Sequence, residues 1–169
     1  MNKPVPSLRV ACRRPSMRAE LNDFIQKLPG SEGIALRWGF RRIPLSRGRH
    51  HGGYVCAFRG EKLVRVESAL ERSVVKMLVA DPACMAIATQ PVTINWSWNG
   101  TTRRYTPDIL VIFEAVPERW RKLGFERLSI VEVKPECAWI EADLRDEHTR
   151  VARIALGMPL IRLPVSGEL

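Results

Sequence analysis

Thr106-Pro107-Asp108 followed by Ile109-Leu110-Val111-Ile112-Phe113 is the stretch that decides the fold. The five residues after the acid are aliphatic, β-branched or aromatic, which is typical of a strand. A second apolar run, Leu128-Ser129-Ile130-Val131, leads directly into Glu132-Val133-Lys134. The two runs predict neighbouring strands that hold two carboxylates and a lysine at one edge of a sheet.

These residue types suit the metal-dependent hydrolysis of a phosphodiester. Mg²⁺ prefers carboxylate oxygens, retained waters and substrate phosphate, so Asp108 and Glu132 are expected to bind it. Side chains two apart on a strand share a face, which places Lys134 beside Glu132, where it can orient water and offset charge on the phosphate. The side chain of Val133 should then point to the packed face and leave its backbone carbonyl as a further metal ligand.

A third acid is expected on an upstream helix, predicted over residues 66–78. Its apolar stripe has the i, i+4, i+7, i+8 spacing of an amphipathic helix and consists of Leu70, Val74, Met77 and Leu78. Glu71 adjoins this stripe and is the acid expected to reach the site. Glu67 is four residues earlier, so it should share a helix face with Glu71. It is interpreted first as a favourable charge at the helix N-terminus and second as a supporting metal residue.

In this order the motifs resemble the PD-(D/E)xK nuclease superfamily, and specifically the TnsA-type transposon endonucleases, over roughly residues 55–165. The matching elements are Ser68-x-Leu70-Glu71, Asp81-Pro82, Gln90-Pro91, Tyr105-Thr106-Pro107-Asp108 and Glu132-Val133-Lys134-Pro135. By position, the family's active-site residues match Glu71, Asp108, Glu132 and Lys134. TnsA proteins carry Gln or Glu where this chain has Glu132.

The resemblance implies a Mg²⁺-dependent DNA endonuclease, with Mn²⁺ as a substitute, and a restriction-endonuclease-like fold. It further implies nicking at transposon ends alongside a transposase and an ATP-dependent regulator. Gln90 either supports the site or simply starts a strand. Longer TnsA-type proteins carry a C-terminal domain for partner contacts, so the transposition role is more open than the nuclease chemistry. The alternative functions are a phage, restriction or repair nuclease of the same fold, or a non-catalytic DNA-binding assembly subunit. A homodimer is a further alternative for the assembly of the chain.

The net charge of +9 favours a polyanionic partner. The excess is local, because residues 1–66 carry 14 Lys and Arg against 4 Asp and Glu, and the remainder carries 13 against 14. We therefore divide the chain into a basic N-terminal extension, residues 1–52, and a nuclease domain, residues 53–169. The extension is expected to contact DNA phosphates, although a solubilising tail or a dock for a protein partner are alternatives. The candidate DNA-binding residues are Arg37, Arg41, Arg42, Arg47 and Arg49.

The remaining pattern predicts an α/β sandwich around a mixed central sheet flanked by helices. A short helix is expected over residues 16–28 with Ser16 as N-cap, and a hairpin over residues 53–66. Asn99-Gly100 predicts a second hairpin turn. A helix over residues 140–156, with His148 on its polar face, should precede a strand over residues 159–164.

Several other classes of protein are excluded by absent patterns. The cysteines, Cys12, Cys56, Cys84 and Cys137, lack zinc-site spacing and suit reduced thiols in a cytoplasmic protein. No apolar segment approaches the ~20 residues needed to span a bilayer, so no membrane partner is expected. The chain shows no phosphate-binding or dinucleotide-binding glycine motif, and neither ATP hydrolysis nor redox chemistry is supported.

Overall fold

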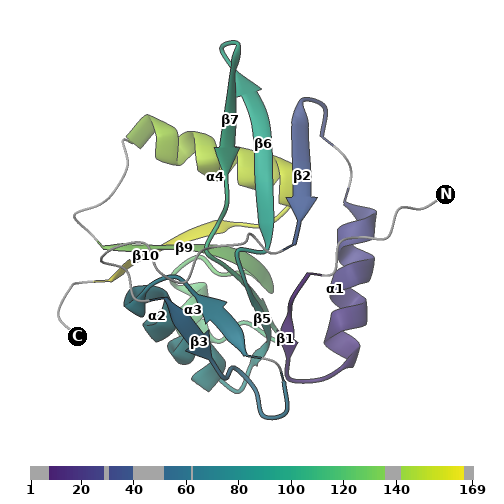
Figure 1. Ribbon diagram of the computed structural model, residues 1–169, viewed down its shortest axis with the longest axis vertical. Helices are drawn as coiled ribbons and strands as arrows, with labels where there is room; N and C mark the ends of the chain where they lie inside the picture. Colours follow the sequence, from purple (N-terminus) through teal and green to yellow (C-terminus); the bar gives the residue numbers. More distant parts are fainter. Residues whose placement is uncertain (1–7, 29–30, 40–51, 62, 136–141, 166–169) are drawn as a thin grey trace.

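A five-stranded mixed sheet, in the order β1-β5-β8-β9-β10, forms the centre of the computed structural model (Figure 1). The structure describes residues 8–28, 31–39, 52–61, 63–135 and 142–165. In chain order the elements are β1 (Ala11–Cys12), α1 (Ser16–Lys27), β2 (Ile34–Trp38), β3 (Gly53–Val55), β4 (Val64–Val66), α2 (Ala69–Ala80), β5 (Cys84–Thr89), β6 (Val92–Trp98), β7 (Thr101–Tyr105), β8 (Ile109–Phe113), α3 (Glu118–Arg121), β9 (Leu128–Pro135), α4 (Ala142–Leu156) and β10 (Leu160–Val165).

The two strands that carry the acidic motifs are neighbours, as predicted. β8 pairs antiparallel with β9, and Ile109 lies opposite Val131. β9 pairs parallel with β10, so the sheet is mixed and the predicted fold class is confirmed. The antiparallel pairing places the beginning of β8 beside the later part of β9. Asp108 and Glu132 are thereby brought to the same part of the sheet.

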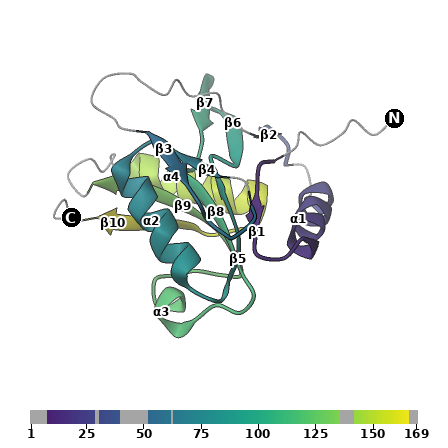
Figure 2. The same ribbon diagram turned by 60° about the horizontal axis from the view of Figure 1, so that its bottom comes forward.

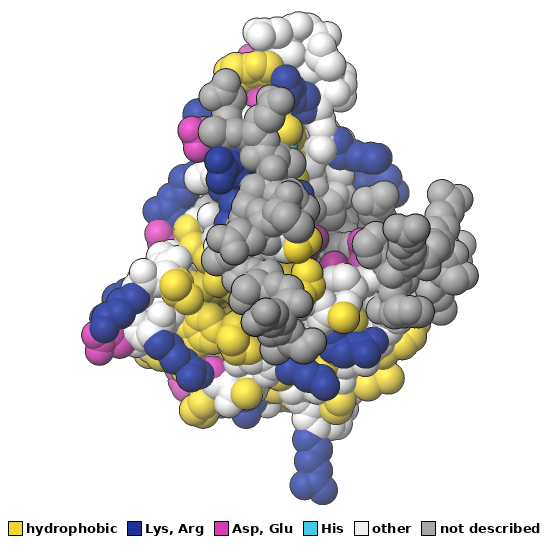
Figure 3. Space-filling view, turned by 90° about the vertical axis from the view of Figure 1, so that its left-hand side faces the viewer, with side chains coloured by type: hydrophobic (Ala, Val, Ile, Leu, Met, Phe, Trp, Pro, Cys, Tyr) yellow, Lys and Arg dark blue, Asp and Glu magenta, His cyan; other side chains and the backbone are white. Residues whose placement is uncertain are grey.

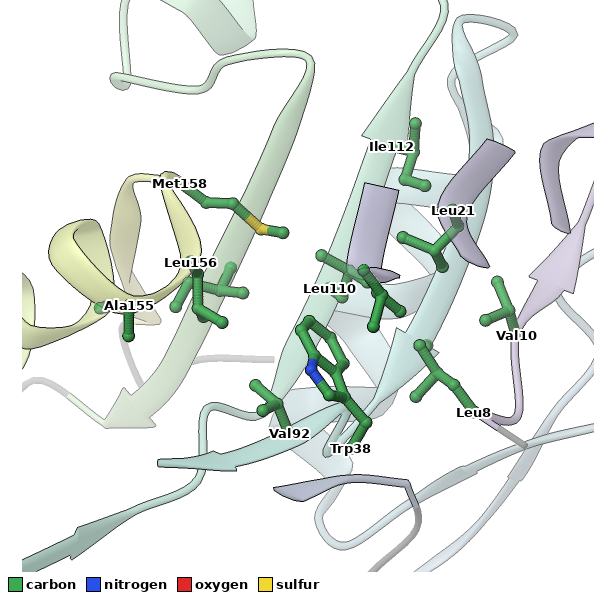
Figure 4. Close-up of a cluster of buried hydrophobic side chains, with 14 of the residues drawn as sticks. Leu8, Val10, Leu21, Trp38, Val92, Leu110, Ile112, Ala155, Leu156 and Met158 are labelled. Atoms are coloured by element: carbon green, nitrogen blue, oxygen red, sulfur yellow. The ribbon is translucent and has the colours of Figure 1, made fainter. Parts of the chain in front are cut away.

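Helices cover both faces of this sheet and bury alternate residues of its strands. On β8, Leu110 and Ile112 pack with α1 and α4, whereas Val111 packs with α2 and with Trp120 of α3. Figure 2 shows α2 and α4 on opposite sides of the strands. Figure 4 shows Leu110 and Ile112 among buried side chains that include Leu21 of α1 and Leu156 of α4. The result is the expected sandwich, in which the apolar residues of each strand alternate between two cores.

A second sheet, in the order β2-β6-β7, stands above the central one in Figure 1. Its β6–β7 hairpin turns at Asn99 (φ 49°) and Gly100 (φ 75°), the left-handed backbone that an Asn-Gly turn adopts readily. This hairpin was predicted. The third strand, β2, lies on the other side of β6 and comes from the basic segment of residues 1–52.

Other parts of that segment pack on the central sheet. β1 pairs with β5, and the buried side chains Met17, Leu21 and Ile25 of α1 belong to the same core as Leu110 and Ile112. The buried residues of α1 therefore belong to the hydrophobic core of the central sheet. Ser16 is the first residue of α1, and the N-cap is Pro15, so the predicted cap position was wrong by one residue.

Helix α2 begins three residues later than the pattern predicted. Ser68 is its N-cap, with an extended backbone (φ −139°, ψ 164°), and Glu67 precedes that cap. The prediction that Glu67 and Glu71 share a helix face was therefore wrong. A strand that the prediction lacked, β5, lies between β1 and β8, and all of its residues are buried.

Some predicted features lie outside the described residues, namely Arg41, Arg42, Arg47, Arg49 and Cys137. The described cysteines form no disulfide. Within the described ranges, no helix is long and apolar enough to cross a membrane.

Candidate functional site

Asp108 is fixed by backbone contacts with β9 at the point where β8 begins. Its N–H donates to the Val131 carbonyl (3.1 Å), and its Oδ2 accepts a hydrogen bond from the Val133 N–H (2.7 Å). The other carboxylate oxygen, Oδ1, accepts no hydrogen bond from a described residue. The acid therefore has one oxygen that positions it and one that is available to a ligand.

Glu132 lies in the middle of β9 and is 2% exposed. Its Oε1 is 2.8 Å from Lys134 Nζ, and its Oε2 is 3.0 Å from Arg162 Nε. Lys134 thus lies beside Glu132, as the two-residue period of a strand predicts. The side chain of Val133 packs on the α2 side of the sheet, also as expected.

Arg162 is the residue that sequence reasoning missed. It stands directly opposite Glu132 in the parallel β9–β10 pairing. Its remaining nitrogens donate to Thr149 Oγ1 (2.9 Å) and to the Arg145 carbonyl (2.8 Å), both on α4. The available signal was a single arginine inside the apolar strand Leu160-Ile161-Arg162-Leu163.

Glu71 forms the capping interactions of α2. The Glu71 N–H donates to Ser68 Oγ (3.1 Å), while Glu71 Oε2 accepts from the Glu67 N–H (2.9 Å). This is close to the reciprocal capping box of a Ser-x-x-Glu sequence, except that the carboxylate accepts from the N–H of the residue before the N-cap. The pKa of Glu71 is raised to about 7, mainly by burial and also by the nearby negative charges of Asp108 and Glu67, while its hydrogen bonds act in the opposite direction. Glu71 is therefore close enough to Asp108 for the two charges to interact.

Gln90 joins the acids from the loop between β5 and β6. Its N–H donates to the Asp108 carbonyl (2.7 Å), and its side-chain Nε2 donates to Glu67 Oε1. Its backbone lies in the left-handed region (φ 45°), a conformation that costs energy for a residue other than glycine. The side-chain Oε1 is buried and has no partner among the described residues. Gln90 therefore lies beside the acids, and β6 begins two residues later.

The acids together create an excess of buried negative charge. Burial is the main cause that raises the pKa of Asp108 to about 6, and the charges of Glu132 and Glu67 add to it, while the Val133 N–H and Lys134 act in the opposite direction. Like charges near one another in a poorly solvated place favour a bound cation or a proton. Within the described part of the chain, however, no three His, Cys, Asp or Glu side chains converge closely enough to form a complete metal site.

Aromatic residues cover the α4 side of the site. His148 is 9% exposed and stacks on Tyr105 with ring centroids 4.2 Å apart. Burial lowers the pKa of His148. The prediction that His148 lies on the polar face of its helix was wrong, because that part of α4 packs against the β6–β7 hairpin. Trp96 contacts the same imidazole edge-on, with ring centroids 5.7 Å apart.

The surface around the site carries both signs of charge. Figure 3 faces the side of the molecule toward which β9 runs, and dark blue Lys and Arg side chains predominate there over magenta acids. Of the candidate DNA-binding arginines, Arg37 lies exposed on β2. The other four belong to the part of the chain that is not described.

Comparison with known proteins supplies one finding. The family described as TnsA-like endonuclease, N-terminal, matches residues 81–156. The matched stretch includes Gln90, Asp108, Glu132 and Lys134, whereas Glu71 and Arg162 lie outside it. Comparison with curated proteins gives no match.

Proposed function

We propose, on the premise of the match between residues 81–156 and the TnsA-like endonuclease N-terminal family, that the protein is a Mg²⁺-dependent DNA endonuclease that nicks transposon ends during cut-and-paste transposition. The observation that carries the proposal is the convergence of Asp108, Glu132 and Lys134 at one place on two neighbouring strands. DNA is the proposed substrate, and a transposase with an ATPase regulator are the proposed partners.

The donor chemistry fits a hard divalent cation. Asp108 Oδ1 is free of hydrogen bonds from described residues, and Glu132 could offer Oε1 once Lys134 turns away from it. Gln90 contributes a buried amide oxygen that has no hydrogen-bond partner among the described residues. All three are oxygen donors of the kind that Mg²⁺ and Mn²⁺ accept. We therefore assign Asp108 and Glu132 as ligands, with Gln90 in support.

The backbone carbonyl of Val133 is a further proposed ligand, on geometric grounds. Its N–H points toward Asp108, to which it donates at 2.7 Å. In a strand the N–H and C=O of one residue are directed to the same edge, since such residues exchange both bonds with one partner. The carbonyl of Val133 is therefore directed to the side where Asp108 lies, in support of the proposed role.

When bound, Mg²⁺ would polarise the phosphodiester and lower the pKa of a bound water. Asp108 would hold its position through the two backbone contacts with β9. Lys134, whose side chain is 36% exposed, can reach from Glu132 toward a phosphate oxygen. Its ammonium would orient the attacking water and stabilise the charge that develops on the phosphate.

Glu71 has two proposed roles that differ in their chemistry. Its side chain already completes the cap of α2, and its charge lies close to that of Asp108. As a ligand, it would bind a second ion or complete the first ion's site. Glu67 is a supporting residue, because it holds Gln90 beside the acids.

The test is cleavage of supercoiled plasmid by the full chain with Mg²⁺ or Mn²⁺, next to an EDTA control. Asp108→Ala should remove cleavage, whereas Asp146→Ala, which removes an exposed aspartate of α4, should not. Metal-dependent nicking that survives in Asp108→Ala at the wild-type rate would remove Asp108 from the mechanism. Wild-type protein that binds DNA but never cleaves, even with its transposase supplied, would favour a non-catalytic assembly subunit.

A further inference from the structure

The β2-β6-β7 sheet has one packed face and one open face. Ile94, Trp96 and Tyr105 are buried on the packed face, and Arg103 on that face pairs with Glu147 of α4 (3.1 Å). Figure 1 shows α4 passing behind the sheet. The alternate residues of the strands must therefore point away from α4.

The open face consists of small polar side chains and two arginines. Its members are Ala35, Arg37, Asn95, Ser97, Thr102 and Arg104. Pairing places Ala35 and Arg104 on either side of Asn95, and Thr102 opposite Ser97. A hollow on the sheet is lined by residues of all three strands, including Ala35, Asn95 and Thr102. Short side chains of this kind let another backbone approach closely.

The charge of this sheet has one sign. None of its three strands contains Asp or Glu. Arg37 and Arg104 are exposed, and neither forms an ion pair with a residue in the described part of the chain. The face is therefore complementary to a polyanion, whereas Arg103, on the opposite face, is neutralised by Glu147.

The open face also leads directly to the candidate site. Thr93 of β6 and Thr106 share a hydrogen bond between their hydroxyls (3.0 Å), and Asp108 follows Thr106 by two residues. Arg104 precedes Asp108 by four residues, a span of at most about 14 Å. Arg37 lies two strands across from Arg104 and two residues further along, at roughly 12 Å, so the two side chains can reach different phosphates.

We propose that the open face of the β2-β6-β7 sheet binds the phosphate backbone of duplex DNA beside the scissile phosphodiester. This inference rests on the proposed function and adds the surface that holds the flanking duplex. Arg37 and Arg104 contact phosphates, and the small polar residues between them let the backbone approach. The contacts position the duplex and carry no sequence information themselves.

The test compares two charge-matched double variants of the full chain. Arg37→Ala/Arg104→Ala removes both arginines of the open face, and Lys76→Ala/Arg121→Ala removes two exposed cations from α2 and α3, on the other side of the central sheet. Binding to a fluorescent duplex of about 30 base pairs is followed by anisotropy in EDTA over a range of salt concentrations. Thermal melting checks that each variant folds.

The open-face variant should bind on the order of tenfold more weakly and lower the salt slope by about 0.9 for each lost phosphate contact. The α2–α3 variant should change the affinity and the salt slope far less. Equal effects of the two variants, or none, would overturn the proposal. If the first variant fails to fold, Thr102→Glu introduces a repulsive charge on the same face and must also weaken binding.

Cleavage by the wild type, measured separately in Mg²⁺, separates this inference from the proposed function. If the wild type cleaves DNA but Arg37→Ala/Arg104→Ala shows no selective loss of binding, the proposed DNA-binding surface is overturned and the proposed nuclease function stands. A selective loss of binding without any cleavage would support the surface and count against the nuclease. The proposed surface would also be overturned if the wild-type protein had no affinity for duplex DNA or preferred single-stranded DNA.

Discussion

Arg162 holds the buried carboxylate of Glu132 from the adjacent parallel strand, with 3.0 Å between Arg162 Nε and Glu132 Oε2. The strand pairing places the two residues directly opposite one another. Two further hydrogen bonds to α4, at Thr149 and Arg145, fix the guanidinium itself. Helix α4 thus positions a candidate metal ligand through Arg162, although neither Thr149 nor Arg145 reaches that ligand in the structure.

Arg162→Ala should destabilise the protein and slow cleavage together. It leaves a carboxylate that is 2% exposed with Lys134 as its only remaining ion-pair partner among the described residues. Removing one partner of a buried pair costs about 3–5 kcal/mol. Urea unfolding measures this cost, and steady-state kinetics at saturating DNA shows whether kcat falls in protein that is still folded.

Arg153→Ala is the matched control for that change. Arg153 also bonds a carboxylate through its guanidinium, that of Glu126 at 2.8 Å, but both side chains are about half exposed. An exposed pair of this kind contributes at most about 1 kcal/mol. Arg162→Lys should restore part of the stability and less of the kcat, because a lysine cannot reproduce the three separate contacts. Equal losses in the Arg162 and Arg153 variants would contradict the positioning role.

Glu71→Gln separates a helix cap from a metal ligand. Glutamine can retain the capping contacts with Ser68 and Glu67, because either side chain serves at this position of a capping box. We expect unfolding free energy at pH 7.5 to be unchanged or higher, and cleavage to fall at least about tenfold, since a neutral amide binds Mg²⁺ less well. Ser68→Ala should have the opposite effects: the free energy of unfolding should fall by about 1 kcal/mol, and cleavage should be retained. Full cleavage by Glu71→Gln would leave Glu71 only a capping role.

The parts of the structure that local sequence determines were predicted well. Asn99-Gly100 specifies its own turn, and the apolar runs before Glu132 and after Asp108 specify strands, because side-chain period and β-branching act within a few residues. The same period placed Lys134 beside Glu132. These features need no knowledge of which element packs against which.

The features that were missed depend on tertiary contacts. The strand β5 contains Cys84-Met85-Ala86, residues with little preference for strands, and it forms because β1 and β8 pair with it. Arg162 acquires its role only when β10 aligns with β9. His148 is buried because the β6–β7 hairpin covers α4, although its helix pattern suggested a solvent face. In each case a long-range neighbour overrides the local signal.

The stability of the protein should depend on pH through Glu71. Its pKa is about 7 in the folded protein and 4.5 ordinarily, so the folded state holds the proton more tightly. The stabilisation that the Glu71 proton gives the folded state is therefore fully present below about pH 4.5 and is lost as pH rises toward 7. The unfolding free energy of Glu71→Gln minus that of wild type should increase across this interval by about 1–3 kcal/mol. Urea titrations at four pH values measure it, and a difference that stays constant would contradict the raised pKa.

Lys134→Met should bind metal at least as tightly as the wild type while it cleaves more slowly. In the structure, Lys134 Nζ lies 2.8 Å from Glu132 Oε1, the oxygen that we propose for the metal. Removing the ammonium frees that oxygen but also removes the donor proposed to stabilise the phosphate. Loss of one such donor typically lowers kcat by about 10²–10³. Titration with Mn²⁺ followed by electron paramagnetic resonance measures binding independently of cleavage, and Asp108→Ala should weaken that binding. Lys134→Met that binds Mn²⁺ much more weakly than wild type would mean that the lysine helps to build the metal site and does not act mainly on the phosphate.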